Sequence, residues 1–197
     1  MNFLAHCLLG HPHDALVAGG VLGDFVKGPV PDTLPVDLQA GIRLHRRIDA
    51  LSNRHPGIGV SVRRLDPDLR RVAPVLVDLI ADHCLALSFD AYGPTTLETF
   101  QTDAYNAIGR YEAWFNPDAK RFYRRMKEAN LLARYRDREV ILRAMRYVLE
   151  RLRHEHVMDR LAGVFDDLDA LQADFDEYFP DLMERAAGWK SENFPVG

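Results

Sequence analysis

Cysteine is scarce in this sequence, and long apolar runs are missing. Only Cys7 and Cys84 occur among 197 residues, too few to form a disulfide framework. No apolar stretch approaches the ~20 residues that a membrane-spanning helix needs. The opening residues include His6 and lack the basic region of a secretory signal. These absences predict a reduced, cytoplasmic protein that does not enter a membrane.

Strand patterns and a strong excess of one charge are also missing. No segment alternates convincingly between apolar and polar residues, and no Asn-Gly hairpin turn occurs. The net charge of −4 argues against a general nucleic-acid binder. Hydrophobic residues make up 47% of the chain, enough for a real core. We therefore expect an all-α, single-domain helical bundle over residues 1–197, with a frayed tail at 190–197.

Apolar residues recur at three- and four-residue steps through much of the chain, which is the signature of helices. The segment from Asp14 to Val26 is apolar and rich in small residues, so a neighbouring helix could approach it closely. Pro74 falls inside the clearest buried pattern, which places the regular start of that helix near 71–73. The expected helices cover 14–26, 36–53, 69–91, a segment opening after Thr95-Thr96, 118–132, 138–152 and 165–187.

Charge is distributed unevenly along the chain. Residues 120–156 hold twelve Lys or Arg against five Asp or Glu, an excess of +7, so the remainder carries −11. A basic stretch in an acidic protein is typical of docking to an acidic partner. Solvated helix faces would give the same pattern, and the sequence alone does not separate the two.

Aspartates and histidines in the first half of the chain fall where chemistry is expected. His45 and Asp49 are four residues apart on an expected helix, and so are Asp78 and Asp82, so each pair shares a helix face. Ionised carboxylates in an apolar stretch are costly unless they are paired or bind a metal.

Three further residues extend this pattern. His6 and Asp24 sit among apolar or small residues, and His83 follows directly after Asp82. Mixed oxygen and nitrogen ligands suit a divalent metal such as Mn²⁺, Mg²⁺ or Fe²⁺, with Zn²⁺ also compatible. The joint pattern predicts a His/Asp metal centre built from three or four helices.

Each of these residues also has an ordinary structural explanation. His6 could be a hydrogen-bonded core histidine, and Asp24 could cap a loop near Gly28. Asp49 could pair with a neighbouring arginine, and Asp78 could bond Arg71. Taken singly, such explanations are as good as metal binding.

Several motifs resemble those of the acyl carrier protein phosphodiesterases. They occur in order along nearly the whole chain. The matching segments are the opening Met-Asn-Phe-Leu-Ala-His, Gly23–Gly28, Gly41–Asp49, Arg70–Pro74, Asp78, Asp82-His83, Tyr135–Asp137 and Asp166–Leu168. The resemblance implies hydrolysis of the phosphodiester that joins 4′-phosphopantetheine to a serine of holo-acyl carrier protein. It also implies a divalent metal, typically Mn²⁺, and a fold that is a rearranged relative of the HD phosphohydrolases.

The same resemblance implies roles for individual residues. Metal ligation is carried over first to His6, Asp24, His45, Asp82 and His83, and then to Asp49 and Asp78 as ligands or supporting partners. The expected catalytic set comprises Asp24, His45 and Asp82. On chemical grounds Lys27, Arg46 and Arg71 are added as cations for the phosphoryl oxygens, although Arg46 and Arg71 could equally be structural partners of Asp49 and Asp78. The order Asp82-His83 reverses the His-Asp dipeptide of HD enzymes.

The basic stretch then becomes a candidate surface for the small, acidic carrier protein, with Arg121, Arg124 and Arg125 as expected contacts. Two other functions stay open. One is an HD-like phosphohydrolase of a nucleotide or another small phosphoester. The other is a non-catalytic helical module that binds a carrier protein and needs no metal.

Overall fold

The computed structural model describes residues 1–194, and within that range every regular element is helical. The α-helices are α1 (Phe3–Gly10), α2 (Asp14–Leu22), α3 (Val36–Ser52), α4 (Pro56–Arg64), α5 (Ala73–Leu87), α6 (Phe89–Tyr92), α7 (Leu97–Arg110), α8 (Pro117–Glu128), α9 (Leu131–Arg134), α10 (Arg138–Leu152) and α11 (Leu168–Asn193). Short 3₁₀ helices are η1 (Gly23–Phe25), η2 (Pro67–Leu69), η3 (Glu112–Trp114) and η4 (Glu155–Gly163). The expected all-α, single-domain fold is confirmed.

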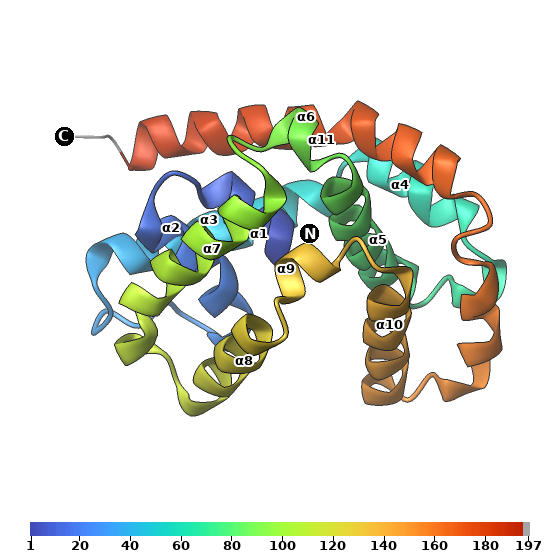
Figure 1. Cartoon of the computed structure of the whole chain (residues 1–197), viewed down its shortest axis with the longest axis horizontal. Coiled ribbons are helices and arrows are strands. Elements are labelled where there is room, and N and C mark those ends of the chain that lie inside the picture. The colour runs from blue at the N-terminus through green and yellow to red at the C-terminus, as the bar shows by residue number, and fades with distance from the viewer. Residues whose placement is uncertain (195–197) are drawn as a thin grey trace.

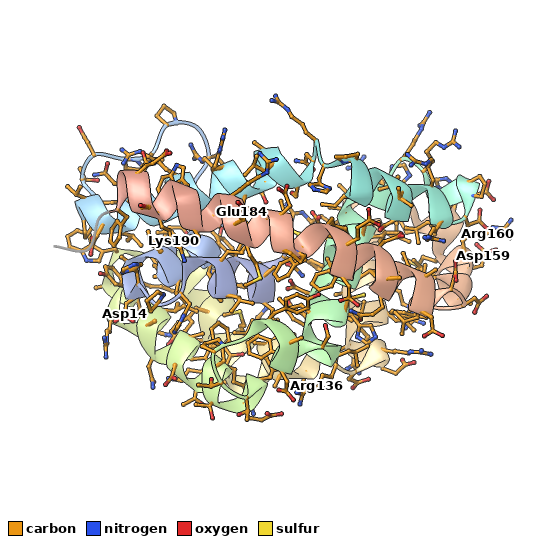
Figure 2. The ribbon with its side chains drawn as sticks, turned by 90° about the horizontal axis from the view of Figure 1, so that it is seen from above. Asp14, Arg136, Asp159, Arg160, Glu184 and Lys190 are labelled. Carbon is orange, nitrogen blue, oxygen red and sulfur yellow. The ribbon has the colours of Figure 1, made fainter. Side chains whose placement is uncertain are left out.

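The helices form an arch around the N-terminus. The long helix α11 runs along the whole molecule, and α8 and α10 extend on opposite sides of the N-terminal residues (Figure 1). Seen from above, α11 crosses the molecule from end to end (Figure 2). It packs on α3, α4 and α5, burying Phe175, Tyr178 and Phe179 beneath it. This helix therefore joins the two halves of the arch, while α1, α2 and α3 form the half that carries His6 and His45.

Helices α2 and α3 approach each other more closely than side chains would allow. A Cβ placed on Gly19 would lie 2.4 Å from the backbone of Gly41, and one on Gly41 would lie 2.4 Å from the carbonyl oxygen of Ala15. The backbones therefore touch, as the small residues of this segment predict. Gly23 makes room in the same way, because its Cβ would fall 2.4 Å from the His45 ring. The glycines thus bring the start of the Asp24 loop against α3.

The expected helices differ from the observed ones mainly at their ends. The segment 69–91 is divided into η2, α5 and α6, and α8 stops at Glu128 because Asn130 turns the chain with a positive φ of 49°. The expected helix over 138–152 matches α10. The frayed tail from residue 190 is wrong in part, since α11 continues through Lys190 to Asn193. Residues 195–197 of that tail lie outside the described residues.

We expect Gly41→Ala to destabilise the fold because the new methyl group meets backbone atoms that cannot move aside. A loss of about 1–3 kcal/mol or more in the free energy of unfolding is expected, measured by urea denaturation. Gly188→Ala is the matched control, since nothing lies within 4 Å of its Cβ in the helix α11. That change should be neutral or stabilising by up to about 1 kcal/mol. Equal stability of both variants would contradict the close α2–α3 contact.

Candidate metal centre

Three side chains from two helices meet at one point inside the arch. His6 lies on α1, and His45 and Asp49 lie one turn apart on α3. Their ligand atoms all lie within 4.8 Å of one another. The Nε2 atom of His6 is 3.1 Å from Asp49 Oδ1, and the Nε2 atom of His45 is 3.2 Å from Asp49 Oδ2. Two imidazoles thus share the two oxygens of one carboxylate.

Backbone contacts orient His45 so that its Nε2 atom faces the cluster. Its Nδ1 atom is 2.9 Å from the carbonyl oxygen of Gly20. A carbonyl only accepts hydrogen bonds, so Nδ1 carries a proton and donates it. Nε2 is then the nitrogen left for a ligand or a second proton, the usual arrangement of a metal-binding histidine.

The two imidazoles differ in their readiness to take a proton. Their rings stack with centroids 4.1 Å apart. Burial, together with the neighbouring His45 ring, lowers the pKa of His6 to about 4. Burial opposes the charge on His45, but Asp49 and Asp24 outweigh it and raise that pKa. The carboxyl of Asp49 is desolvated, yet its two imidazole partners hold its pKa well below the ordinary value.

This donor set fits a divalent cation. It offers one carboxylate and two imidazole nitrogens, the kinds of atom that Mn²⁺, Fe²⁺ or Zn²⁺ accept. Nδ1 of His6 is buried and has no hydrogen-bond partner in the described part of the chain. Without a metal, one carboxylate must satisfy both rings.

Asp24 lies beside the cluster on its more exposed side. Its Oδ1 atom is 3.8 Å from His45 Nε2, and its side chain is 51% exposed. Partial burial raises its pKa, and the Asp49 carboxylate adds to that effect. Its loop is held by two contacts to backbone carbonyls. Arg46 donates to the carbonyl oxygen of Val26 at 2.9 Å, and Asn116 donates to that of Phe25 at 2.9 Å.

Asp78 contacts the cluster through the chain's amino group. The Met1 nitrogen lies 3.0 Å from Asp78 Oδ1 and 3.6 Å from Asp49 Oδ1. Burial disfavours the charge on this amine, but Asp78 and Asp49 outweigh it and raise its pKa. Asp78 is therefore a supporting partner in this arrangement, linked to Asp49 by a shared cation.

Asp82 and His83 do not join the cluster. Asp82 is fully buried, and its two oxygens accept the backbone N–H groups of Leu4 and Ala5 at 2.8 and 3.0 Å. It therefore caps the first turn of α1, the helix that carries His6. His83 faces the other way, with Nδ1 2.6 Å from the carbonyl oxygen of Tyr135. Its buried Nε2 has no partner in residues 1–194.

The three cations expected to contact the phosphoryl oxygens do not gather at the cluster. Arg46 is engaged with Val26, as described above, so it positions the loop. Lys27 is exposed on the same loop, and its charge offsets part of the rise in the pKa of Asp24. Arg71 is exposed and lines a pocket with Arg70, His154 and His156, away from the cluster. Of the three, Lys27 is the one that lies on the Asp24 loop and forms no ion pair or side-chain hydrogen bond with any residue from 1 to 194.

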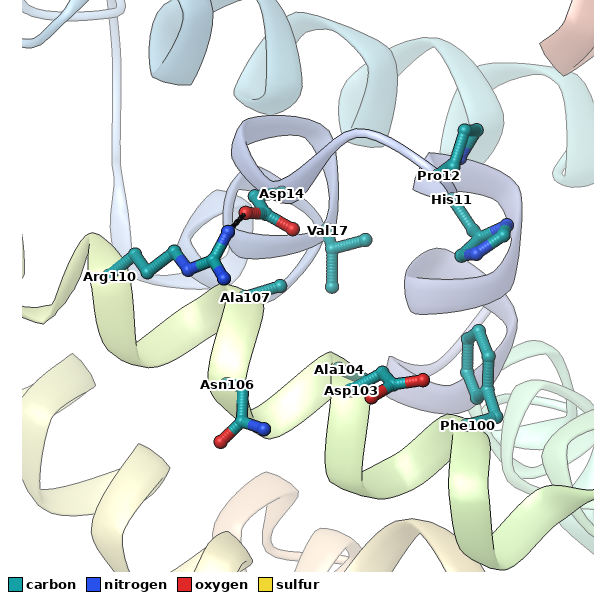
Figure 3. Close-up of a pocket in the computed structure, with 10 residues that line it drawn as sticks. All are labelled: His11, Pro12, Asp14, Val17, Phe100, Asp103, Ala104, Asn106, Ala107 and Arg110. Atoms are coloured by element: carbon teal, nitrogen blue, oxygen red, sulfur yellow. Dashed lines mark hydrogen bonds and ion pairs between the residues drawn. The ribbon is translucent and has the colours of Figure 1, made fainter.

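A polar pocket elsewhere on the surface shares no residue with the cluster. It has a volume of about 280 Å³ and lies between the α1–α2 turn and α7. Figure 3 shows the ion pair of Arg110 with Asp14 at one end, and His11, Phe100 and Asp103 at the other. The chemistry of the His/Asp cluster is therefore not located in this pocket.

Comparison with known proteins identifies the family. The family model described as acyl carrier protein phosphodiesterase matches residues 1–184. The chain belongs to this family. A relative of that name from Photorhabdus laumondii is 33% identical, over 94% of this chain and 95% of its own. Relatives of the same name from Enterobacter sp. and Escherichia coli O6:H1 are 32% and 30% identical, over 94% and 95% of this chain and 97% and 98% of their own. No solved structure matches the chain.

Membership in the phosphodiesterase family makes the chain a phosphodiesterase, as its motifs suggest. Within the described residues, no helix is both long and apolar enough to cross a membrane. Sequence reasoning missed the amino group of Met1 and the loop anchor Asn116. The amine belongs to the backbone, so no residue type reveals it. Asn116 is 91 residues from Phe25, so no helical or strand spacing links the two.

We expect Mn²⁺ to stabilise this phosphodiesterase against heat through the cluster. A hundredfold excess of metal over its Kd stabilises a folded protein by about 2.7 kcal/mol. Asp49→Asn should abolish the rise in Tm, because the amide cannot serve two imidazoles and a cation. The matched control is Asp159→Asn in the exposed η4 segment at the far end of the molecule (Figure 2). An unchanged Mn²⁺ response in Asp49→Asn would rule out the cluster as the binding site.

The buried Asp82 should give the metal-free protein a distinctive pH dependence. Burial raises the pKa of Asp82 from 3.8 to about 7, although the Leu4 and Ala5 N–H groups oppose this. Between these values the unfolded chain loses a proton that the folded protein retains, so stability falls as pH rises from about 4 to about 7.

Asp82→Asn removes this titration. In EDTA, the stability of the unaltered protein relative to the variant should therefore decrease by more than about 1 kcal/mol between pH 5 and pH 8. Urea unfolding at both values measures the difference. A constant difference would mean that Asp82 is already ionised in the folded protein at pH 5.

Proposed function

We propose that this phosphodiesterase removes 4′-phosphopantetheine from the serine of holo-acyl carrier protein, with a divalent metal held by His6, His45 and Asp49. Water adds to phosphorus and the bond from phosphorus to the serine oxygen breaks. The products are apo-acyl carrier protein and 4′-phosphopantetheine. The observation that carries the proposal is the shared Asp49 carboxylate between two imidazoles, in a chain whose family is described as acyl carrier protein phosphodiesterase.

Each residue of the site has a role in this proposal. Asp49 and the Nε2 atoms of both histidines would hold the cation, which supplies a Lewis acid and lowers the pKa of bound water. Asp24 is positioned to complete the ligand set or to accept a proton from water, because it lies beside His45 and is half exposed. Lys27 lies on the same loop, has no partner among residues 1–194, and is proposed to neutralise charge on the phosphoryl oxygens.

Asp78, Asp82 and Arg46 support the site through other groups. Asp78 fixes the Met1 amine against Asp49, Asp82 fixes the first turn of α1, and Arg46 fixes the Asp24 loop. Metal ligation by Asp82 or His83 stays a prediction. Asp82 would have to give up its contacts to Leu4 and Ala5, whereas His83 has the unpartnered Nε2 available but lies outside the cluster. The HD-like ancestry of the fold and the choice of Mn²⁺ over Mg²⁺ or Fe²⁺ are likewise predictions.

The exposure of the carboxylates indicates the side from which the diester approaches. His6 and His45 are almost fully buried, whereas Asp49 is 37% and Asp24 51% exposed. The neighbouring helix α8 borders this side, because Phe122 packs against Phe25 at 5.4 Å between ring centroids. A carrier protein at this side would present its modified serine to the cluster.

We propose α8 as one contact for that partner, through Arg121, Arg124 and Arg125. Arg121 is paired with Asp118, and Arg124 with Glu112 at 2.8 Å. Arg125 is exposed and forms no ion pair with any described residue, and it lies one turn from Phe122 on the same helix. Of these three arginines, Arg125 is the one whose charge is not already compensated, so it would interact most strongly with an acidic partner. A cytoplasmic location, consistent with two free buried cysteines, belongs to the same proposal.

The direct test is the mass of holo-acyl carrier protein after incubation with the enzyme. We expect loss of the phosphopantetheine mass with Mn²⁺, no loss in EDTA, and no loss with Asp24→Ala or Asp49→Asn. Asp159→Asn should retain activity. Intact carrier protein with a metal-loaded enzyme, combined with hydrolysis of a nucleotide or another small phosphoester, would instead identify a small-molecule phosphohydrolase. A protein that binds no metal and hydrolyses neither substrate would fit the binding-module alternative.

A further inference from the structure

The exposed face of α10 is the second basic surface of the arch. The helix buries Val140, Ile141, Met145 and Leu149, and it packs on α5. Arg143, Arg146, Tyr147, Glu150 and Arg151 stand at positions i, i+3, i+4, i+7 and i+8, so they form one stripe along the helix. All five are exposed. The stripe carries three arginines against one glutamate.

The arginine side chains of this stripe have no partner among the described residues. Arg143, Arg146 and Arg151 form no ion pair or hydrogen bond from their side chains to any residue from 1 to 194. On α8, by contrast, two of the three arginines are already paired with acidic residues. Guanidinium groups without a partner retain their full electrostatic attraction for an incoming carboxylate.

Apolar surface accompanies the charge. Tyr147 is 63% exposed and Leu152 is 47% exposed, both unusually high for large apolar residues of this protein. Exposed tyrosine and arginine side chains together are typical of the centres of protein interfaces. Tyr147 lies within the stripe, and a helix face that served solubility alone would not need it. Leu152, the last residue of α10, lies outside the stripe because it follows the buried Leu149 by three residues.

A basic pocket adjoins the end of α10. It has a volume of about 390 Å³, and Arg70, Arg71, His154 and His156 line it. His154 comes three residues after Arg151, so the basic surface continues from the helix to the pocket. The one carboxylate that lines it, Asp68, is paired with Arg160 at 3.1 Å.

The position of α10 connects this surface to the metal centre. Tyr135, just before α10, accepts a hydrogen bond at its hydroxyl from Asn2 at 3.4 Å, and Asn2 adjoins the Met1 amine that contacts Asp49. Helices α8 and α10 flank the N-terminal residues on opposite sides (Figure 1). Phe122 of α8 packs against Phe25 of the Asp24 loop, so a small protein that touched both helices would lie beside Asp24.

We propose that the α10 stripe and its adjoining pocket dock the acidic surface of the carrier protein. The proposal rests on the proposed function, since it takes the occupant from that reaction. Charge complementarity selects the occupant: an acidic protein meets unpaired arginines, while the overall charge of −4 does not favour nucleic acid.

The test is the double charge reversal Arg143→Glu with Arg146→Glu, compared with Arg54→Glu and Arg63→Glu. Both control residues are exposed, and their reversal changes the net charge equally. Arg54 lies between α3 and α4, and Arg63 lies in the last turn of α4. We expect the α10 variant to raise KM for holo-acyl carrier protein by about tenfold, with kcat within about twofold, because lost steering slows association. Tyr147→Ala should also raise KM. The control pair should leave KM unchanged.

An unchanged KM in the α10 variant, or an equal rise in both double variants, would overturn the docking surface. If the unaltered enzyme leaves holo-acyl carrier protein intact, the proposed function fails separately. Fluorescence anisotropy of labelled apo-acyl carrier protein at low salt then decides the docking question. Weaker binding by the α10 variant alone supports the surface, and equal binding by all three proteins overturns it.

Discussion

The carboxylate of Asp49 lies between imidazoles from two different helices, and the surrounding structure holds that contact in place. A single carboxylate with two nearly buried imidazole partners constrains the relative positions of α1 and α3 to within hydrogen-bond distance. The same three donors are of the kinds that a divalent cation accepts. The metal site that we propose and the polar contact that joins α1 to α3 therefore use the same cluster.

Two features bring the helices to this position. The Gly19–Gly41 contact lets α2 touch α3, which places the Gly20 carbonyl under His45 and turns its Nε2 toward the cluster. Asp82 caps α1 from the neighbouring helix α5 and so fixes the turn that carries His6. Because that cap is buried, it costs solvation, and the hydrogen bonds to Leu4 and Ala5 offset only part of this cost.

The sequence predicts the helical class and much of the candidate site, but not the partner of each buried charge. The spacing of His45 and Asp49 placed them on one face, and that pair is at the centre of the cluster. Asp82 shows the same kind of spacing with Asp78, yet each meets a different partner. A buried carboxylate in a periodic pattern shows that some compensation exists. Whether it comes from a metal, an amine or a backbone N–H 77 residues away depends on tertiary packing.

Pulsed EPR of the Mn²⁺-loaded protein, which detects imidazole nitrogens bound to the ion, tests the central claim most directly. The account predicts two coupled imidazole nitrogens, one of which disappears in His6→Gln and the other in His45→Gln, while His83→Gln leaves both. Couplings that survive both of the first two changes, or that are lost with His83→Gln, would place the metal elsewhere and contradict the account.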